Sequence, residues 1–267
     1  MALTTRDGLV AAIAASQDIS FYKASMTSAA GFWSSLWAEA GFPSAGSLSI
    51  GNTANGVVPT DATAGAPVID AFTGDTGYVG AWGCLSSATG AVVLYDRVFH
   101  AGSFVMSSLT TLNLTSQPSY ASRVPGSNWR ECEIWIEVNT VFSASAVTLA
   151  VNYQDGNNAA QNTVTTGSLT GYPTKRMFPL ALANNTGVQR INSVTIGGAT
   201  NTGTFNIVVL RRLVRSVVAT ANIGEPRLDF FRTGGQIVFA DSCLALMWLG
   251  TGTSSGNVFG DCQIING

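Results

Sequence analysis

The chain has 267 residues, of which 46% are apolar and only 10% are charged, and its formal net charge is −2. Disordered chains combine low hydrophobicity with high net charge, so this composition excludes disorder, and the small net charge excludes a general basic field for nucleic acid. Because ordinary globular proteins carry roughly 25% charged residues, the shortage of charge favours a chain that hides surface against partners, as an oligomer or within an assembly.

Helix signals are confined to the N-terminal forty residues. Thr4 or Thr5 can cap a first helix that has Asp7 in its first turn. A second helix is expected over residues 28–40, ended by Gly41 and Pro43. Its apolar face would consist of Phe32, Trp33, Leu36 and Trp37. So many large side chains on a short helix need a partner surface, which is either this protein's own sheet or a neighbouring chain.

Residues 41–74 are mostly Gly, Ser, Thr, Ala and Pro, which predicts an extended arm laid against a surface. From residue 78 onward the pattern becomes that of short strands. The clearest strand covers residues 131–138, where apolar side chains alternate with acids. Further strands are expected at residues 90–99, 146–153, 162–166, 188–196, 204–211, 236–239, 243–249 and 258–265.

These patterns predict a mainly β protein. Short strands separated by Gly, Asn and Thr turns favour an antiparallel β-sandwich of jelly-roll type, with a short helical segment before it. The expected organisation is an N-terminal helical segment and extended arm over residues 1–75, followed by a sandwich domain over residues 76–267.

Charge is distributed unevenly along the chain. No Lys or Arg occurs from residue 24 to 95, where the charges are Glu39, Asp61, Asp70 and Asp75. Between residues 175 and 232 the balance is reversed, and this part includes the cluster Arg211, Arg212 and Arg215. Two interpretations stay open: scattered solvated charge, or complementary faces that meet between subunits or on a capsid.

Catalytic groups are scarce in this sequence. His100 is the only histidine, and it has no nucleophile motif near it. The four cysteines lack the short spacing of a metal or redox motif, which predicts reduced thiols in a core. We therefore expect no enzyme activity, no cofactor and no metal site.

One strand face invites a different interpretation. Glu133, Trp135 and Glu137 are expected to share it, at spacings where paired acids and an aromatic ring could bind sugar. Alternating acids on the wet face of a half-buried strand would have the same pattern. Both possibilities remain at this point.

No stretch approaches the ~20 apolar residues that a membrane-spanning helix needs, so no membrane association is expected. The short apolar run at residues 9–15 is better explained by an amphipathic helix than by a signal peptide. We expect the protein to be cytoplasmic in the host before assembly.

Several short segments together resemble a group of tailed-phage and prophage virion proteins that serve as structural or head-decoration (cement) proteins. The segments lie at residues 23–37, 58–65, 94–97, 133–137, 241–247 and 256–260, and so span nearly the whole chain. The resemblance implies a jelly-roll-like protein on the capsid surface, a homotrimer, with the major capsid protein as its partner. It supplies no catalytic residues.

The expected function is therefore to decorate and stabilise a phage capsid by bridging major capsid protein subunits. The residues expected at the protein interface are Phe32, Trp33, Leu36, Trp37, Arg211, Arg212 and Arg215. The alternative is a tail-associated receptor-binding or carbohydrate-binding module that uses Glu133, Trp135 and Glu137. Neither function involves nucleic acid.

Overall fold

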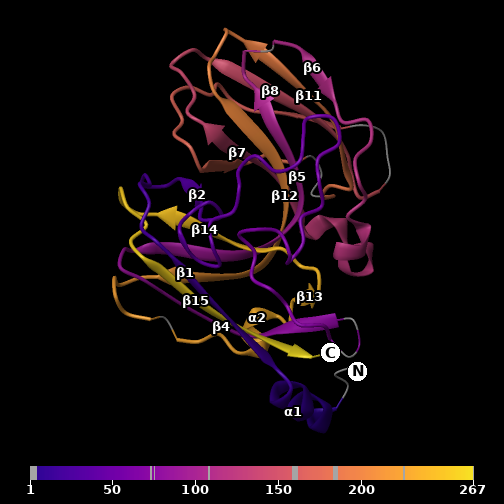
Figure 1. The fold of residues 1–267 in the computed structure, drawn as a ribbon, viewed down its shortest axis with the longest axis vertical. Helices are drawn as coiled ribbons and strands as arrows, with labels where there is room; N and C mark the ends of the chain where they lie inside the picture. The colour runs from indigo at the N-terminus through magenta and orange to yellow at the C-terminus, as the bar shows by residue number, and fades with distance from the viewer. Residues whose placement is uncertain are drawn as a thin grey trace. The chain divides into compact units, whose positions relative to one another are not determined.

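The computed structural model describes residues 5–72, 74, 76–107, 109–157, 162–182, 186–224 and 226–266, and Figure 1 traces them with their elements labelled. Of the residues named above, Thr4 and Asp75 lie outside the described set.

The described chain is mainly β. Its helical elements are α1 (Arg6–Ala14), η1 (Ala121–Arg123), η2 (Pro125–Ser127), η3 (Trp129–Glu131) and α2 (Phe230–Thr233). Its strands are β1 (Gln17–Lys23), β2 (Trp33–Ser35), β3 (Gly41–Phe42), β4 (Thr76–Ser86), β5 (Gly90–Val105), β6 (Thr111–Asn113), β7 (Cys132–Thr140), β8 (Val147–Gln154), β9 (Asn162–Thr165), β10 (Arg176–Pro179), β11 (Arg190–Gly198), β12 (Thr204–Val218), β13 (Ile237–Phe239), β14 (Leu244–Gly250) and β15 (Val258–Asn266). The mainly β fold with a short N-terminal helix is confirmed.

The chain divides into two compact units. Unit 1 comprises Met1–Gly46, Thr60–Asp96 and Leu213–Gly267, and unit 2 comprises Ser47–Pro59 and Arg97–Arg212. This division differs from the expected segments 1–75 and 76–267. The N-terminal residues belong to unit 1 because β1 pairs along its whole length with the C-terminal strand β15.

Unit 1 contains a five-stranded antiparallel sheet with the order β13-β4-β15-β1-β3. Strand β14 pairs on one side with β2 and on the other with the first half of β5. One hydrophobic core draws on both sets of strands, with Phe21 from β1, Trp82 from β4 and Trp248 from β14 among its largest members. Both sets of strands are antiparallel and contribute side chains to this core.

Unit 2 has the same plan with other strands. Its four-stranded sheet has the order β6-β11-β8-β9, and β7 pairs with β10 on one side and β12 on the other. The strands expected at residues 146–153 and 162–166 form an antiparallel pair, in which Tyr153 pairs with Asn162. A separate core fills this unit, with Phe104 stacked on Phe205 at 5.2 Å between ring centroids.

The first predicted helix is present and the second is not. Thr5 caps α1 as expected, because its Oγ1 accepts a hydrogen bond from the Gly8 amide at 3.0 Å. The prediction of a helix over residues 28–40 was wrong: Trp33–Ser35 forms β2 and pairs with β14. Gly31, at φ 76°, has a left-handed backbone conformation that a helix does not allow, and strand pairing overrides the helix-like spacing of the apolar residues.

Among the described helices, none has both the length and the apolar character needed to cross a membrane.

Candidate functional site

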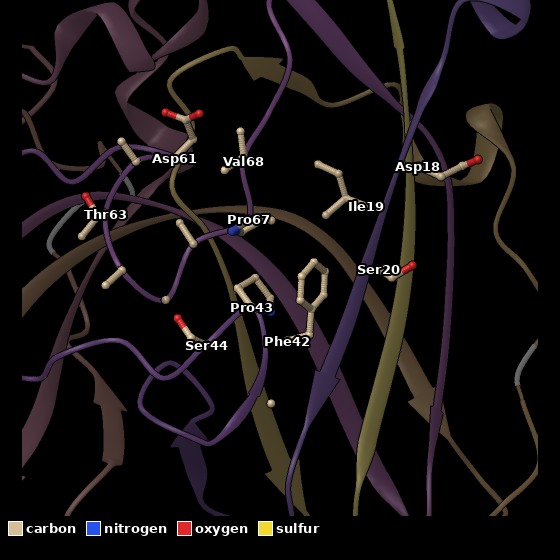
Figure 2. A pocket seen from close by; sticks show the side chains of 15 residues that line it. Asp18, Ile19, Ser20, Phe42, Pro43, Ser44, Asp61, Thr63, Pro67 and Val68 are labelled. Atoms are coloured by element: carbon tan, nitrogen blue, oxygen red, sulfur yellow. The ribbon is translucent and has the colours of Figure 1, made fainter.

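A groove opens at one edge of the five-stranded sheet of unit 1. We call it the edge groove; it has a volume of about 550 Å³ and is lined by residues 18–20, 41–44 and 61–68 (Figure 2). Two of its large apolar side chains are strongly exposed: Val68 is 73% exposed and Phe42 is 61% exposed. The lining also carries the carboxylates of Asp18 and Asp61 and no basic side chain. An exposed apolar hollow with fixed charges is typical of a binding surface.

Side-chain hydrogen bonds hold the loop that forms one wall of the groove. Gln17 bonds the backbone of Asp70 in both directions, with Nε2 donating to the carbonyl at 3.1 Å and Oε1 accepting from the amide at 2.9 Å. The Asp61 carboxylate accepts a hydrogen bond from the Ile69 amide at 3.3 Å. The wall is therefore attached to β1 and closed on itself.

Lys23 holds the opposite wall. Its Nζ donates to the carbonyls of Glu39 at 3.3 Å, Pro43 at 2.8 Å and Ser44 at 3.4 Å, and the residue is only 2% exposed. Burial lowers the pKa of Lys23 to about 8, and the nearby charge of Glu39 opposes this shift. Because the buried Lys23 ammonium group donates hydrogen bonds to three backbone carbonyls, it holds residues 39–44 in place. We call Lys23 the clamp of this segment.

The floor of the groove includes an open sheet edge. Strand β1 pairs with β15 along its length, but β3 covers only Tyr22 and Lys23 on the other side. Within the described part of the chain, no strand pairs with Asp18–Phe21 on that side. An open edge presents backbone N–H and C=O groups that another chain can use, so this edge needs a cover or a partner.

The structure separates the predicted aromatic interface residues. Phe32 is 44% exposed and Trp33 is half-buried in β2, so both reach the surface. Leu36 and Trp37 are 0% and 1% exposed, and Trp37 packs so closely on Gly46 and Gly65 that a Cβ at either glycine would lie within 3.1 Å of its ring. The prediction that Leu36 and Trp37 contact a partner was wrong, because both side chains are buried in the core of unit 1.

The predicted arginine cluster is split in the same way. Arg212 and Arg215 are exposed on β12, whereas Arg211 is fully buried, with its guanidinium 3.7 Å from the carboxylate of Glu131. Strand alternation explains the split, since neighbouring residues on a strand face opposite sides. Arg211 is therefore corrected from a surface contact to an internal ion pair.

The proposed sugar-binding face does not exist as a surface. Trp135 is 3% exposed and its Nε1 donates to Glu133 at 2.9 Å, while Glu137 is fully buried. Strand β7 has partners on both edges, and both of its faces carry buried side chains, so the alternation of acids does not mark a wet face here. Of the three residues only Glu133 keeps partial exposure.

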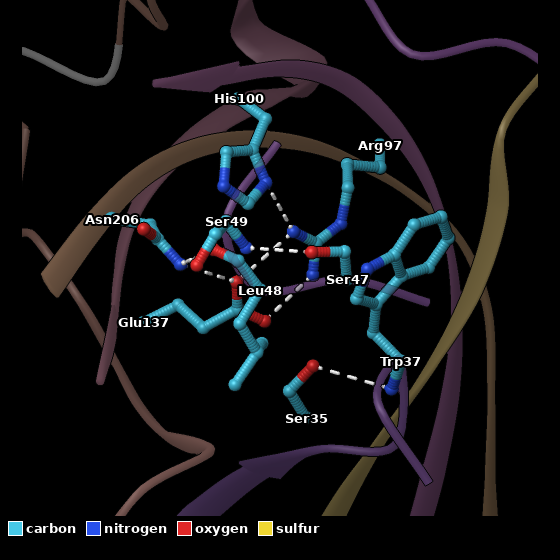
Figure 3. Close-up of polar contacts among 9 residues, drawn as sticks. All are labelled: Ser35, Trp37, Ser47, Leu48, Ser49, Arg97, His100, Glu137 and Asn206. Carbon is cyan, nitrogen blue, oxygen red and sulfur yellow. Dashed lines mark hydrogen bonds and ion pairs between the residues drawn. The ribbon is translucent and has the colours of Figure 1, made fainter. Parts of the chain in front are cut away.

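Glu137 instead belongs to a buried polar cluster in unit 2, which we call the Arg97 cluster (Figure 3). The Arg97 guanidinium binds both oxygens of Glu137, at 2.7 and 3.1 Å, and the two side chains are 1% and 0% exposed. Asn206 donates to Glu137 at 3.3 Å and to the Leu48 carbonyl at 2.7 Å. A two-point ion pair with a further donor is the arrangement that makes buried charge tolerable.

His100, the sole histidine of the chain, is a member of the Arg97 cluster. Its Nδ1 lies 2.7 Å from Arg97 Nη1, and since a guanidinium only donates, Nδ1 accepts and the ring proton resides on Nε2. Burial, followed by the charge of Arg97, lowers the pKa of His100 to about 3. The imidazole is thus neutral and fully buried, and its Nδ1 accepts the hydrogen bond from Arg97.

The cysteines are buried as predicted. Cys84, Cys132, Cys243 and Cys262 are all buried free thiols. Burial raises the pKa of Cys262 to about 12, which keeps this thiol protonated at neutral pH.

Comparisons with known proteins show only weak similarity. No protein-family model matches the chain, and no curated protein matches it. Among solved structures, the VP2 subviral particle of infectious bursal disease virus is 12% identical with a TM-score of 0.19, over 68% of this chain and 40% of that one. Pseudomonas aeruginosa AlgX is 8% identical with a TM-score of 0.20, over 50% of this chain and 26% of that one. The chain thus spans less than half the length of either structure, and TM-scores this low support no argument about function.

Proposed function

We propose that this protein is a structural virion component that decorates a phage capsid and stabilises it by bridging major capsid protein subunits. The observation that carries the proposal is the amount of large apolar surface left uncovered on unit 1. Ten of its described large hydrophobic side chains are at least 36% exposed: Val10, Ile13, Tyr22, Phe32, Phe42, Val68, Val217, Ile223, Phe231 and Phe259. Such a surface on a chain with 10% charged residues favours burial against other proteins.

The state of the reactive groups supports a binding role. The only imidazole is buried and neutral, and the four thiols are buried as well. The capsid as the partner, and a homotrimeric state, come from the resemblance of the sequence segments to phage decoration proteins.

The stabilising mechanism is thermodynamic. A protein that binds the assembled lattice but not free subunits shifts the equilibrium toward the lattice by mass action. Contacts with several subunits at once add avidity, so modest single contacts are sufficient.

The test is to mix the purified protein with empty expanded heads and to separate bound from free protein on a density gradient. We expect saturable co-sedimentation and a higher denaturant concentration for head disassembly. Protein that stays at the top of the gradient at every concentration, with head stability unchanged, would contradict the proposal.

Two matched variants locate the contact. Phe32 is 44% exposed on unit 1, and Val105 is 45% exposed on unit 2. Phe32→Ser is expected to weaken head binding at least tenfold because exposed aromatic anchors dominate interface energy. Val105→Ser lies outside the exposed apolar surface of unit 1, serves as the control and is expected to bind heads like the unmodified protein. Trp37→Ala is not a suitable probe, since it would remove a core side chain.

A further inference from the structure

The five-stranded sheet of unit 1 ends in two unlike edges. At one edge β1 and β3 border the edge groove. At the other edge β4 pairs with β13 and with a single bridge at Leu228, and the short helix α2 packs on β4. We call this second edge, with α2 and the arginines beside it, the α2 edge.

A protruding aromatic side chain marks the α2 edge. Phe231 is 83% exposed, the highest value among the described large hydrophobic residues. Its position is well defined: the Phe230 ring packs against Tyr78 at 6.4 Å between centroids, and Thr233 Oγ1 donates to the Val79 carbonyl at 2.7 Å. Helix α2 is thus fastened to β4 while Phe231 points away from the core.

The α2 edge is positively charged. Arg215 and Arg232 line a hollow of about 260 Å³ together with Val217, Pro226 and Leu228. Neither arginine forms an ion pair with a carboxylate among the described residues. The Asp229 side chain accepts a hydrogen bond from the backbone amide of Arg232 at 3.0 Å.

The edge groove is negatively charged, and it also exposes large apolar side chains. Asp18 and Asp61 are its only charged lining residues, and Val68 and Phe42 are the next most exposed large hydrophobic residues after Phe231. Two cations lie near the groove but are already engaged. Arg227 binds Asp261 at 2.9 Å and approaches Asp18 at 3.7 Å, and Lys23 donates to backbone carbonyls.

We propose that the α2 edge of one copy docks into the edge groove of a second copy. The Phe231 ring would enter between Phe42 and Val68, which covers the three most exposed large hydrophobic side chains together. Arg215 and Arg232 would approach Asp18 and Asp61, so opposite charges set the register.

The contact is head-to-tail, because it joins the α2 edge of one copy to a different surface, the edge groove, of the next. Strands β13 and β4 beside the α2 edge and strands β1 and β3 beside the groove lie at opposite edges of one sheet, with β15 between them, so the contact joins unlike edges of two copies. Each copy therefore offers one of each half, which generates a ring if the rotation closes. This contact concerns copies of the protein alone and is measured without capsids, so its failure and the failure of capsid binding are separable.

Two double variants test the contact, one in each half. Phe231→Ser with Arg232→Glu disables the α2 edge, and Asp18→Lys with Val68→Ser disables the groove. All four side chains are exposed, and hydrogen exchange should show both variants folded. Val10→Ser is the control, since Val10 is 60% exposed but lies on α1, outside both halves.

Sedimentation velocity over a range of concentrations gives the readout. The unmodified protein and the Val10→Ser control should associate, with at least tenfold weaker association at high salt because exposed charges are screened. Each double variant alone should stay monomeric. An equimolar mixture of the two should form a dimer, since one intact α2 edge then meets one intact groove.

Three outcomes would overturn the proposal. The unmodified protein could remain monomeric at all concentrations, either double variant could associate as well as the unmodified protein, or the mixture could stay monomeric. The first outcome would leave the open edge of β1 available for an extended segment of another protein, and the second would indicate a symmetric contact that uses one edge twice.

Discussion

Units 1 and 2 are built in the same way but differ in which side chains they bury and which they expose. Both pack antiparallel strands around a hydrophobic core, but unit 2 buries the Arg97–Glu137 ion pair, whereas the groove and the α2 edge of unit 1 expose Asp18, Arg215 and Arg232. Ten described large hydrophobic side chains are exposed on unit 1, against three on unit 2, namely Val105, Leu109 and Val141. The difference concentrates exposed apolar side chains on unit 1, which is why the proposed contacts with other molecules are placed there.

The largest effect on stability is expected when one partner of the buried ion pair in unit 2 is removed, which tests whether this pair orders the unit. Glu137→Ala would leave Arg97 buried without its counter-charge, and such losses cost about 3–5 kcal/mol. Hydrogen exchange followed peptide by peptide should show faster exchange in residues 97–105 and 132–140.

A double substitution is the matched control for this prediction. Arg97→Met with Glu137→Leu removes both charges and should recover a large part of the lost stability, because apolar replacements of a buried pair are often tolerated. If Glu137→Ala alone unfolds with the same denaturant midpoint as the unmodified protein, the Arg97 cluster does not stabilise unit 2.

The second prediction concerns the clamp of unit 1. Lys23→Met keeps an aliphatic side chain but leaves the carbonyls of Glu39, Pro43 and Ser44 without their donor. Unsatisfied buried groups cost about 1–3 kcal/mol each, so a loss of about 2–3 kcal/mol in unfolding free energy is expected after partial access of water.

Denaturant unfolding checks the size of this loss, and hydrogen exchange checks its location. Exchange should rise in residues 39–44 while peptides of unit 2 remain unchanged. Equal acceleration in both units would contradict the role of Lys23 as a local clamp.

The smallest expected effect is a pH dependence of unit 2. His100 has a pKa lowered from 6.5 to about 3 in the folded chain, so between these values the unfolded chain binds more protons. Stability is therefore fully present above pH 6.5 and falls as the pH drops toward 3. One proton gives at most about 1.4 kcal/mol per pH unit, or about 2 kcal/mol between pH 6.5 and 5.

His100→Gln sharpens this prediction, since its amide oxygen can accept from Arg97 and does not titrate. Denaturant midpoints at pH 6.5 and 5.0 should differ less in the variant than in the unmodified protein. An unchanged pH dependence would assign it to other groups.

Much of the strand content was predictable from the sequence. Alternation identified residues 131–138 and 146–153, and both are strands, β7 and β8. Strand β1 was missed because Lys23 occupies a buried position of the Ile19, Phe21, Lys23 face and disguises the alternation. The helix over residues 28–40 failed for the converse reason, since apolar spacing alone could not reveal that β14 would pair with Trp33–Ser35.

The candidate site was only partly predictable. The uneven charge along the chain left complementary faces as one of two interpretations, and Asp61 and Arg215 line two separate hollows of unit 1. The exposed Phe231 carries no signal in the sequence, because a phenylalanine beside another is more often a core residue. Trp135 and Glu137 were misplaced, since β7 is covered on both faces.

What the sequence by itself determined is the class of the molecule: antiparallel strands, buried thiols and few charges. These properties follow from local periodicity and composition, which each segment carries on its own. The tertiary structure decided which polar residues are buried as pairs, which apolar ones stay exposed, and which distant segments form one groove. Those outcomes depend on pairing between residues far apart in the chain, such as β1 with β15, and no local pattern specifies them.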